Sequence, residues 1–201
     1  MKPFRVVTGV AAPLPLANVD TDMINRGRRD KAVGRSILGA GLFHDLRYHP
    51  DGSPNPDFIL NRPEYRRARI LVAGPNLGLG TSQEHAAHAL DDFGIRCVIS
   101  SKIDDLFHSH CVNAGVLPLV LEQSIVDQLM ADAMVPQKAL MTIDLESQEI
   151  VRAGGQTVRF DVPSPVRDRL LQSSDEIDLT MQSAAATESV ATKRKVTLPS
   201  L

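Results

Sequence analysis

The chain of 201 residues has only two cysteines, no tryptophan and few aromatic residues. Cys97 and Cys111 do not form a C-x-x-C pair, which argues against a disulfide scaffold and against a self-contained thiolate metal site. We expect both to be ordinary small core residues. If a metal cluster takes part in the function, it belongs to another chain.

Long apolar runs and a large net charge are also lacking. No uninterrupted apolar stretch reaches the roughly 18 residues of a membrane-spanning helix, and Pro13 and Pro15 interrupt the N-terminal segment. A formal charge of −2 creates no field that would gather nucleic acid or an anionic membrane. We therefore expect a cytoplasmic protein that binds neither. Its 43% hydrophobic content is sufficient for one buried core.

Apolar runs and amphipathic segments alternate through the middle of the chain. Strands are predicted at 5–12, 68–73, 97–101 and 116–121, and helices at 82–93, 103–114 and 124–134. Their alternation favours a parallel α/β core. Further strands at 141–145, 149–152 and 156–161 predict a smaller β layer beside this core, and a short helix is expected near 166–171.

Two segments have no clear periodicity. Residues 16–63 are rich in Gly, Pro, Asn, Asp and Arg and are predicted to be mostly irregular, as functional or disordered loops are. Residues 183–201 are rich in Ala, Ser and Thr, and we expect a disordered C-terminal tail there. Residues 1–182 then form a single domain.

A glycine-rich loop at 74–80 precedes the helix predicted at 82–93. Gly78 and Gly80 allow the backbone to approach a ligand, and a helix N-terminus favours negative charge. A dinucleotide site is disfavoured, because Gln83 stands where G-x-G-x-x-G requires its third glycine. A carboxylate or phosphate of a small substrate is the better candidate.

Two hydroxyls, of Thr81 and Ser82, are predicted at the start of the same helix. Either one can act as a base if surrounding donors stabilise its alkoxide, and the alternative is that both only cap the helix. His85 and His88 share a helix face, but no third ligand has convincing spacing. We predict no metal site and interpret both as polar surface or supporting residues.

Five segments follow the order of a known enzyme family. They are residues 18–24, 41–45, 54–61, 76–86 and 113–118. On these segments the chain, from about Val10 to Gln182, resembles the small subunits of 3-isopropylmalate dehydratase, which belong to the aconitase superfamily and to leucine biosynthesis.

The resemblance implies a three-layer β/β/α swivelling domain that closes over a large subunit holding a 4Fe–4S cluster. In that family an open iron acts as a Lewis acid on the hydroxyl of a malate-like acid, while a serine of the small domain removes the neighbouring proton. Water leaves and returns at the exchanged position. An arginine beside the serine binds a substrate carboxylate through two hydrogen bonds. The small subunit itself holds no cofactor.

Two motifs depart from the family pattern. Gly-Ser-Ser-Arg-Glu-His is Gly80-Thr81-Ser82-Gln83-Glu84-His85 here, so Thr81 has the base position and Gln83 replaces the arginine. Threonine keeps the hydroxyl with a stiffer χ1, whereas glutamine lacks the charge that strengthens such bonds.

The second departure follows Asp22, where the family has Ile-Ile-Pro and a largely apolar stretch, and where this chain carries Arg26, Arg28 and Arg29. One hypothesis is that an arginine replaces the charge missing at Gln83 or binds an extra acid group of the substrate. The alternative is a solvated basic loop. Asp22 is the expected supporting carboxylate, although Asp20 and Asp22 can equally cap the loop.

Three hypotheses follow: a hydro-lyase for a malate-like acid other than 3-isopropylmalate, an authentic 3-isopropylmalate isomerase, or a non-catalytic scaffold or regulatory subunit. The predicted catalytic residues are Thr81, Ser82 and Asp22, and the predicted substrate-binding residues are Gly78, Gly80, Gln83, Arg26, Arg28 and Arg29.

Overall fold

The computed structural model describes residues 2–25, 35–81 and 83–172. Its strands are β1 (Val6–Leu14), β2 (Ile70–Ala73), β3 (Cys97–Ser100), β4 (Leu117–Val120), β5 (Leu140–Asp144), β6 (Glu149–Arg152) and β7 (Thr157–Arg159). Its α-helices are α1 (Thr21–Ile24), α2 (His44–Arg47), α3 (Gln83–Phe93), α4 (Asp105–Ala114), α5 (Gln123–Ala133) and α6 (Ser164–Gln172). Three 3₁₀ helices are η1 (Arg35–Gly41), η2 (Ile59–Asn61) and η3 (Pro136–Lys138).

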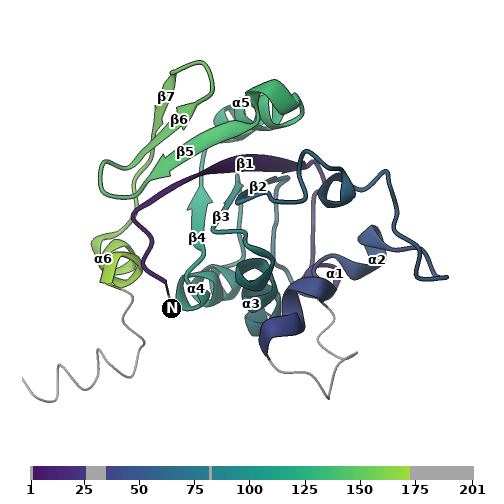
Figure 1. The fold of residues 1–201 in the computed structure, drawn as a ribbon. Helices are drawn as coiled ribbons and strands as arrows, with labels where there is room; N and C mark the ends of the chain where they lie inside the picture. The colour runs from purple at the N-terminus through teal and green to yellow at the C-terminus, as the bar shows by residue number, and fades with distance from the viewer. Residues whose placement is uncertain (1, 26–34, 82, 173–201) are drawn as a thin grey trace, which may run out of the picture.

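The seven strands form one sheet in the order β4-β3-β2-β1-β5-β6-β7. The strands from β1 to β4 are parallel, whereas β5, β6 and β7 are antiparallel. Strand β1 joins the two parts, because Val6–Val10 pair with β5 and Ala11–Leu14 pair with β2. Figure 1 shows β1 running between the parallel strands and the antiparallel strands. The predicted α/β class is confirmed, and the smaller β layer is a curled continuation of the main sheet.

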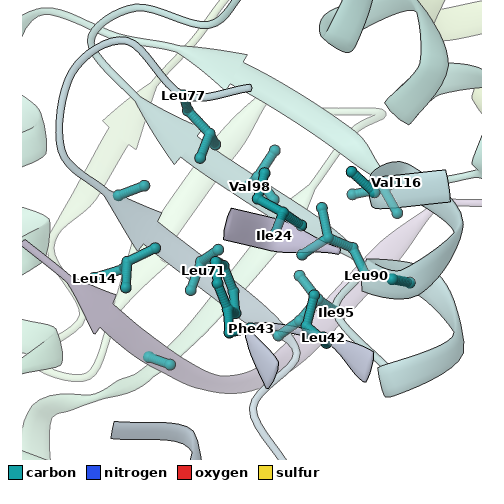
Figure 2. Close-up of a cluster of buried hydrophobic side chains, with 14 of the residues drawn as sticks. Leu14, Ile24, Leu42, Phe43, Leu71, Leu77, Leu90, Ile95, Val98 and Val116 are labelled. Atoms are coloured by element: carbon teal, nitrogen blue, oxygen red, sulfur yellow. The ribbon is translucent and has the colours of Figure 1, made fainter. Parts of the chain in front are cut away.

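The sheet separates two hydrophobic clusters. Side chains alternate along β1, so Ala12 and Leu14 belong to the cluster with α3 and α4, whereas Val7 and Ala11 belong to the cluster with α5 and α6. The first cluster contains most of the side chains drawn in Figure 2. Both faces of the parallel strands are therefore covered, which explains why β2 and β3 are buried at every position and, apart from Ser100, apolar.

The segment at 16–63 is more ordered than its composition predicts. The described part of it holds α1, η1, α2 and η2, and contributes Ile24, Leu42, Phe43 and Leu60 to the first cluster. Each short element buries only a few apolar residues, so no periodicity is visible in the sequence. More than half of the described residues of the segment lie outside these elements, so the prediction of a mostly irregular segment is confirmed for them, although the segment packs on the core.

The predicted domain end near residue 182 and the tail at 183–201 lie outside the described residues and stay predictions. Within the part of the chain that the structure describes, no helix has the length and apolar character needed to cross a bilayer.

Candidate active site

The loops after β1 and β2 meet at one edge of the sheet. Since the two strands are parallel neighbours, both loops leave from the carboxyl ends of the strands, where ligands bind in open α/β sheets. Three backbone hydrogen bonds connect the loops, from Asn18 N to Pro75 O (2.9 Å), from Gly78 N to Val19 O (2.7 Å) and from Thr21 N to Leu79 O (2.7 Å). The loop of Thr81 and the helix of Asp22 are therefore neighbours.

The glycines of this loop are enclosed by other parts of the protein. Gly78 has a φ of +86°, and a Cβ there would lie 2.1 Å from the Phe107 ring. Gly80 has a φ of +113°, and its Cβ would lie 2.9 Å from Thr21 Oγ1. Packing thus gives both positions a reason to be glycine without any ligand. Substrate contact at Gly78 and Gly80 stays a prediction.

Helix α3 begins at Gln83, directly beyond this loop. Ala86, Ala89 and Leu90 attach α3 to the first cluster, while Thr81 is exposed to solvent. The N-terminal end of an 11-residue helix favours an anion at this point. Ser82 lies outside the described residues, so its capping and its catalytic interpretations both stay open.

His85 and His88, the two histidines considered as possible metal ligands, both lie in α3. His85 is exposed, and His88 Nε2 lies 3.8 Å from Glu84 Oε1. Among the residues that the structure describes, no three His, Cys, Asp or Glu side chains converge as a metal site would require.

The two aspartates of α1 have different environments. Asp20 precedes α1 and accepts a hydrogen bond from Met23 N at 2.6 Å through its Oδ1, so its side chain caps the helix. Asp22 lies in the first turn and is exposed, while Ile24 is fully buried and holds α1 on the core. Asp22 is thus available beside the Gly-rich loop. Arg26, Arg28 and Arg29 lie outside the described residues.

Sequence reasoning missed three polar residues between these loops. Thr21 is 1% exposed and lies against Gly80. Asn18 and Asn76 both have left-handed backbone, with φ of 57° and 61°. The only available signal was that asparagine tolerates this conformation better than most residues.

The cysteines do not fit an iron–sulfur cluster. Cys97 and Cys111 are completely buried in the two hydrophobic clusters, and burial raises the pKa of both thiols well above its ordinary value. A cluster requires thiolates and usually four ligands. These two side chains provide neither the charge state nor the number.

Fold and site agree with one class of protein, the swivelling domains of aconitase type. Residues 1–124 match the family model of the aconitase C-terminal domain. The fold resembles the crystal structure of 3-isopropylmalate dehydratase from Methanocaldococcus jannaschii, with a TM-score of 0.65 and 21% identity, covering 92% of this chain and 99% of that one.

Relatives with higher sequence identity show to which family within this class the chain belongs. The chain is 50% identical to the 3-isopropylmalate dehydratase small subunit of Sinorhizobium fredii over 186 residues, 92% of each chain. It is 47% identical to the small subunit of Allorhizobium ampelinum over 199 residues, 99% of each chain. The protein therefore belongs to the family of 3-isopropylmalate dehydratase small subunits.

Proposed function

We propose that this chain is the small subunit of a heteromeric hydro-lyase that isomerises 3-isopropylmalate by dehydration and rehydration. The observation that carries this proposal is the 50% identity to a 3-isopropylmalate dehydratase small subunit over 92% of both chains. A small subunit implies a large one as partner. The cytoplasm and the leucine pathway are the setting that we propose for the reaction.

The 4Fe–4S cluster implied by the family belongs, in this proposal, to the large subunit. The buried, protonated thiols of Cys97 and Cys111 support that division, because they do not suit a cluster. The contribution of this chain is then restricted to proton transfer and to binding of the substrate.

The hydroxyl of Thr81 or Ser82 serves as the base in this reaction. Its alkoxide takes the proton from the carbon next to the one that bears the substrate hydroxyl, and the C–H electron pair becomes the double bond. The substrate hydroxyl leaves with its bonding electrons as hydroxide, which takes up a proton from solvent to become water. Water then adds in the opposite orientation. The N-terminal end of α3 favours the alkoxide. Asp22, on the adjoining helix α1, is the supporting carboxylate of this proposal.

Substrate carboxylates bind at the same helix end. The backbone at Gly78 and Gly80 lets the substrate approach closely, the amide of Gln83 supplies a neutral donor, and one of Arg26, Arg28 and Arg29 supplies the charge that Gln83 lacks. A malate-like acid with a further acid group is the alternative substrate that these arginines favour.

Reconstitution with the cognate large subunit under anaerobic conditions tests the proposal. Turnover of 3-isopropylmalate, citrate, homocitrate and methyl-substituted malates is measured through the absorbance of the unsaturated intermediate. We expect turnover of 3-isopropylmalate and none by either subunit alone. Turnover of another acid only would change the substrate, and no turnover with a loaded cluster would favour a non-catalytic subunit.

The variant Gln83→Arg separates the remaining alternatives. If the chain is an isomerase that tolerates glutamine, the added charge raises turnover of 3-isopropylmalate. If the site was built around glutamine for another acid, the same change lowers turnover of that acid. A rate of zero in both the wild type and the variant would contradict both enzyme interpretations.

A further inference from the structure

We propose that Asn18 and Asn76 are positioning residues whose side chains fasten the loop of Thr81 to the loop that leads into Asp22. Asn76 Nδ2 donates a hydrogen bond of 2.7 Å to Asn18 Oδ1. We call this pair the asparagine clasp. Its catalytic effect rests on the proposed function, whereas its effect on the two loops does not.

The two asparagines share an uncommon backbone conformation. Each has a left-handed φ, of 57° at Asn18 and 61° at Asn76. Glycine adopts this conformation without cost, whereas a residue with a Cβ does so at some expense. Asparagine tolerates it better than most residues do, and at these two positions the amide groups also form the 2.7 Å hydrogen bond between the loops.

The clasp lies beside the backbone connections between the loops. Asn18 N donates to Pro75 O (2.9 Å), and the connections continue through Gly78 N to Val19 O and Thr21 N to Leu79 O, both 2.7 Å. Next along the chain come Gly80 and the exposed Thr81. A shift at the clasp therefore reaches the reactive hydroxyl through only a few bonded residues.

The core holds each loop from one side only. Leu77 and Ile24 are buried in the same cluster, and Figure 2 shows both among Leu71, Val98 and the other core side chains. Asn18 is exposed and Asn76 half-buried, so the clasp closes the outer side of the pair of loops. Removing it leaves no cavity in the core, and the fold can survive while the loops gain freedom.

Positioning of this kind affects the chemical step more than binding. A base must stand at a fixed distance from the carbon that loses its proton, and misplacement by about 1 Å can reduce the rate on the order of 100-fold. The clasp acts together with the three backbone hydrogen bonds to fix the distance between the loop of Thr81 and the helix of Asp22.

Glycine variants isolate the side-chain bond, because glycine keeps the left-handed backbone. In the reconstituted complex we expect Asn76→Gly and Asn18→Gly to lower kcat about 10-fold with a smaller change in KM. Gln148→Gly is the matched control. Gln148 also has a left-handed φ, of 56°, and its Oε1 accepts a hydrogen bond of 2.7 Å from Val162 N, but it lies between β5 and β6. Its kcat should stay within about twofold of the wild type.

Asn18→Asp is the conservative variant that keeps the hydrogen bond, because the aspartate side chain still has an oxygen that accepts from Asn76 Nδ2. We expect this variant to have a kcat near the wild-type value. Any effect of the added negative charge should appear in KM. A residue with a merely structural role would not separate Asn18→Asp from Asn18→Gly in this way. Equal kcat in Asn18→Gly, Asn76→Gly and the wild type would overturn the catalytic part of the proposal.

Amide hydrogen exchange of the complex measures the clasp without turnover. Peptides containing the Gly78 and Thr21 amides should exchange faster in Asn76→Gly than in the wild type and the Gln148→Gly control. Unchanged exchange would overturn the clasp itself. If the wild-type complex turns over no acid while exchange responds as expected, the proposed function fails and the clasp stands.

Discussion

Left-handed glycines occur at the carboxyl edge of the parallel strands and in the antiparallel meander, but their surroundings differ. At the edge, a Cβ on Gly78 would lie 2.1 Å from the Phe107 ring, and one on Gly80 would lie 2.9 Å from Thr21 Oγ1. In the meander, Gly155 has a φ of +80° and no atom within 4 Å of the position of a Cβ. The comparison shows that neighbours enforce the backbone at the site, whereas the meander needs only a turn.

The side chains of the two regions show a related difference. The asparagine clasp joins loops that follow two different strands, whereas the bond from Val162 N to Gln148 Oε1 joins neighbouring parts of one meander. The site therefore depends on contacts between distant segments. Variants that weaken such contacts should affect the site more than matched variants in the meander.

The largest expected difference is between Gly78→Ala and Gly155→Ala. At Gly78 the new methyl group overlaps a buried ring and the backbone is strained, so we expect the free energy of unfolding to fall by on the order of 3–5 kcal/mol. At Gly155 only the strain of a left-handed alanine acts, so we expect the free energy of unfolding to fall by about 1 kcal/mol. Urea denaturation of both variants measures the difference. Equal losses would show that the site loop is no more constrained than a turn.

A smaller effect is expected within the meander and its supporting helix. The half-buried pair of Arg152 Nε and Asp132 Oδ2, 2.5 Å apart, joins β6 to α5. We expect Arg152→Met to reduce the free energy of unfolding by about 1–3 kcal/mol, because Asp132 loses its partner in a partly dry position.

The exposed pair of Arg159 and Glu149 is the control for this variant, since Arg159 is 87% exposed. We expect Arg159→Met to change the stability by less than about 1 kcal/mol. Thermal unfolding of the two variants compares the pairs. A larger loss at Arg159 would contradict the importance of burial.

The smallest effect is expected for alkylation of the cysteines. Burial raises the pKa of both thiols, so hardly any thiolate exists in the folded chain at pH 8. Iodoacetamide should leave Cys97 and Cys111 unmodified in the folded protein and modify both in urea, as mass spectrometry would show. Rapid modification of the folded chain would reopen the question of a metal site on this subunit.

The α/β core was predictable because its signals are local. The strands at Ile70–Ala73 and Cys97–Ser100 and the helix at Gln83–Phe93 lie within two residues of the predicted bounds. Compact apolar runs and helical periodicity at Ala86, Ala89 and Leu90 carry this information within one segment. The role of β1 as the strand common to both parts of the sheet depends on distant partners and has no such local signal.

The candidate site was predictable only in part. The resemblance placed Asp22 and Thr81 in one site, and the structure shows their loops to be neighbours. For Asp20 the sequence allowed either a supporting role in the site or a cap, and the structure shows the cap. The contact between Asn18 and Asn76 could not be predicted, since 58 residues separate them and asparagine in a loop is ordinary.

The most direct test of the account compares Thr81→Val with Thr8→Val in the reconstituted complex. Both changes remove a threonine hydroxyl, but Thr8 lies in β1 with its Oγ1 2.8 Å from Thr142 Oγ1, on an exposed part of the sheet. We expect kcat for 3-isopropylmalate to fall about 100-fold or more in Thr81→Val, as loss of a proton-transfer group does, and to stay near the wild-type value in Thr8→Val. Equal and undiminished turnover in both variants would contradict the assignment of Thr81.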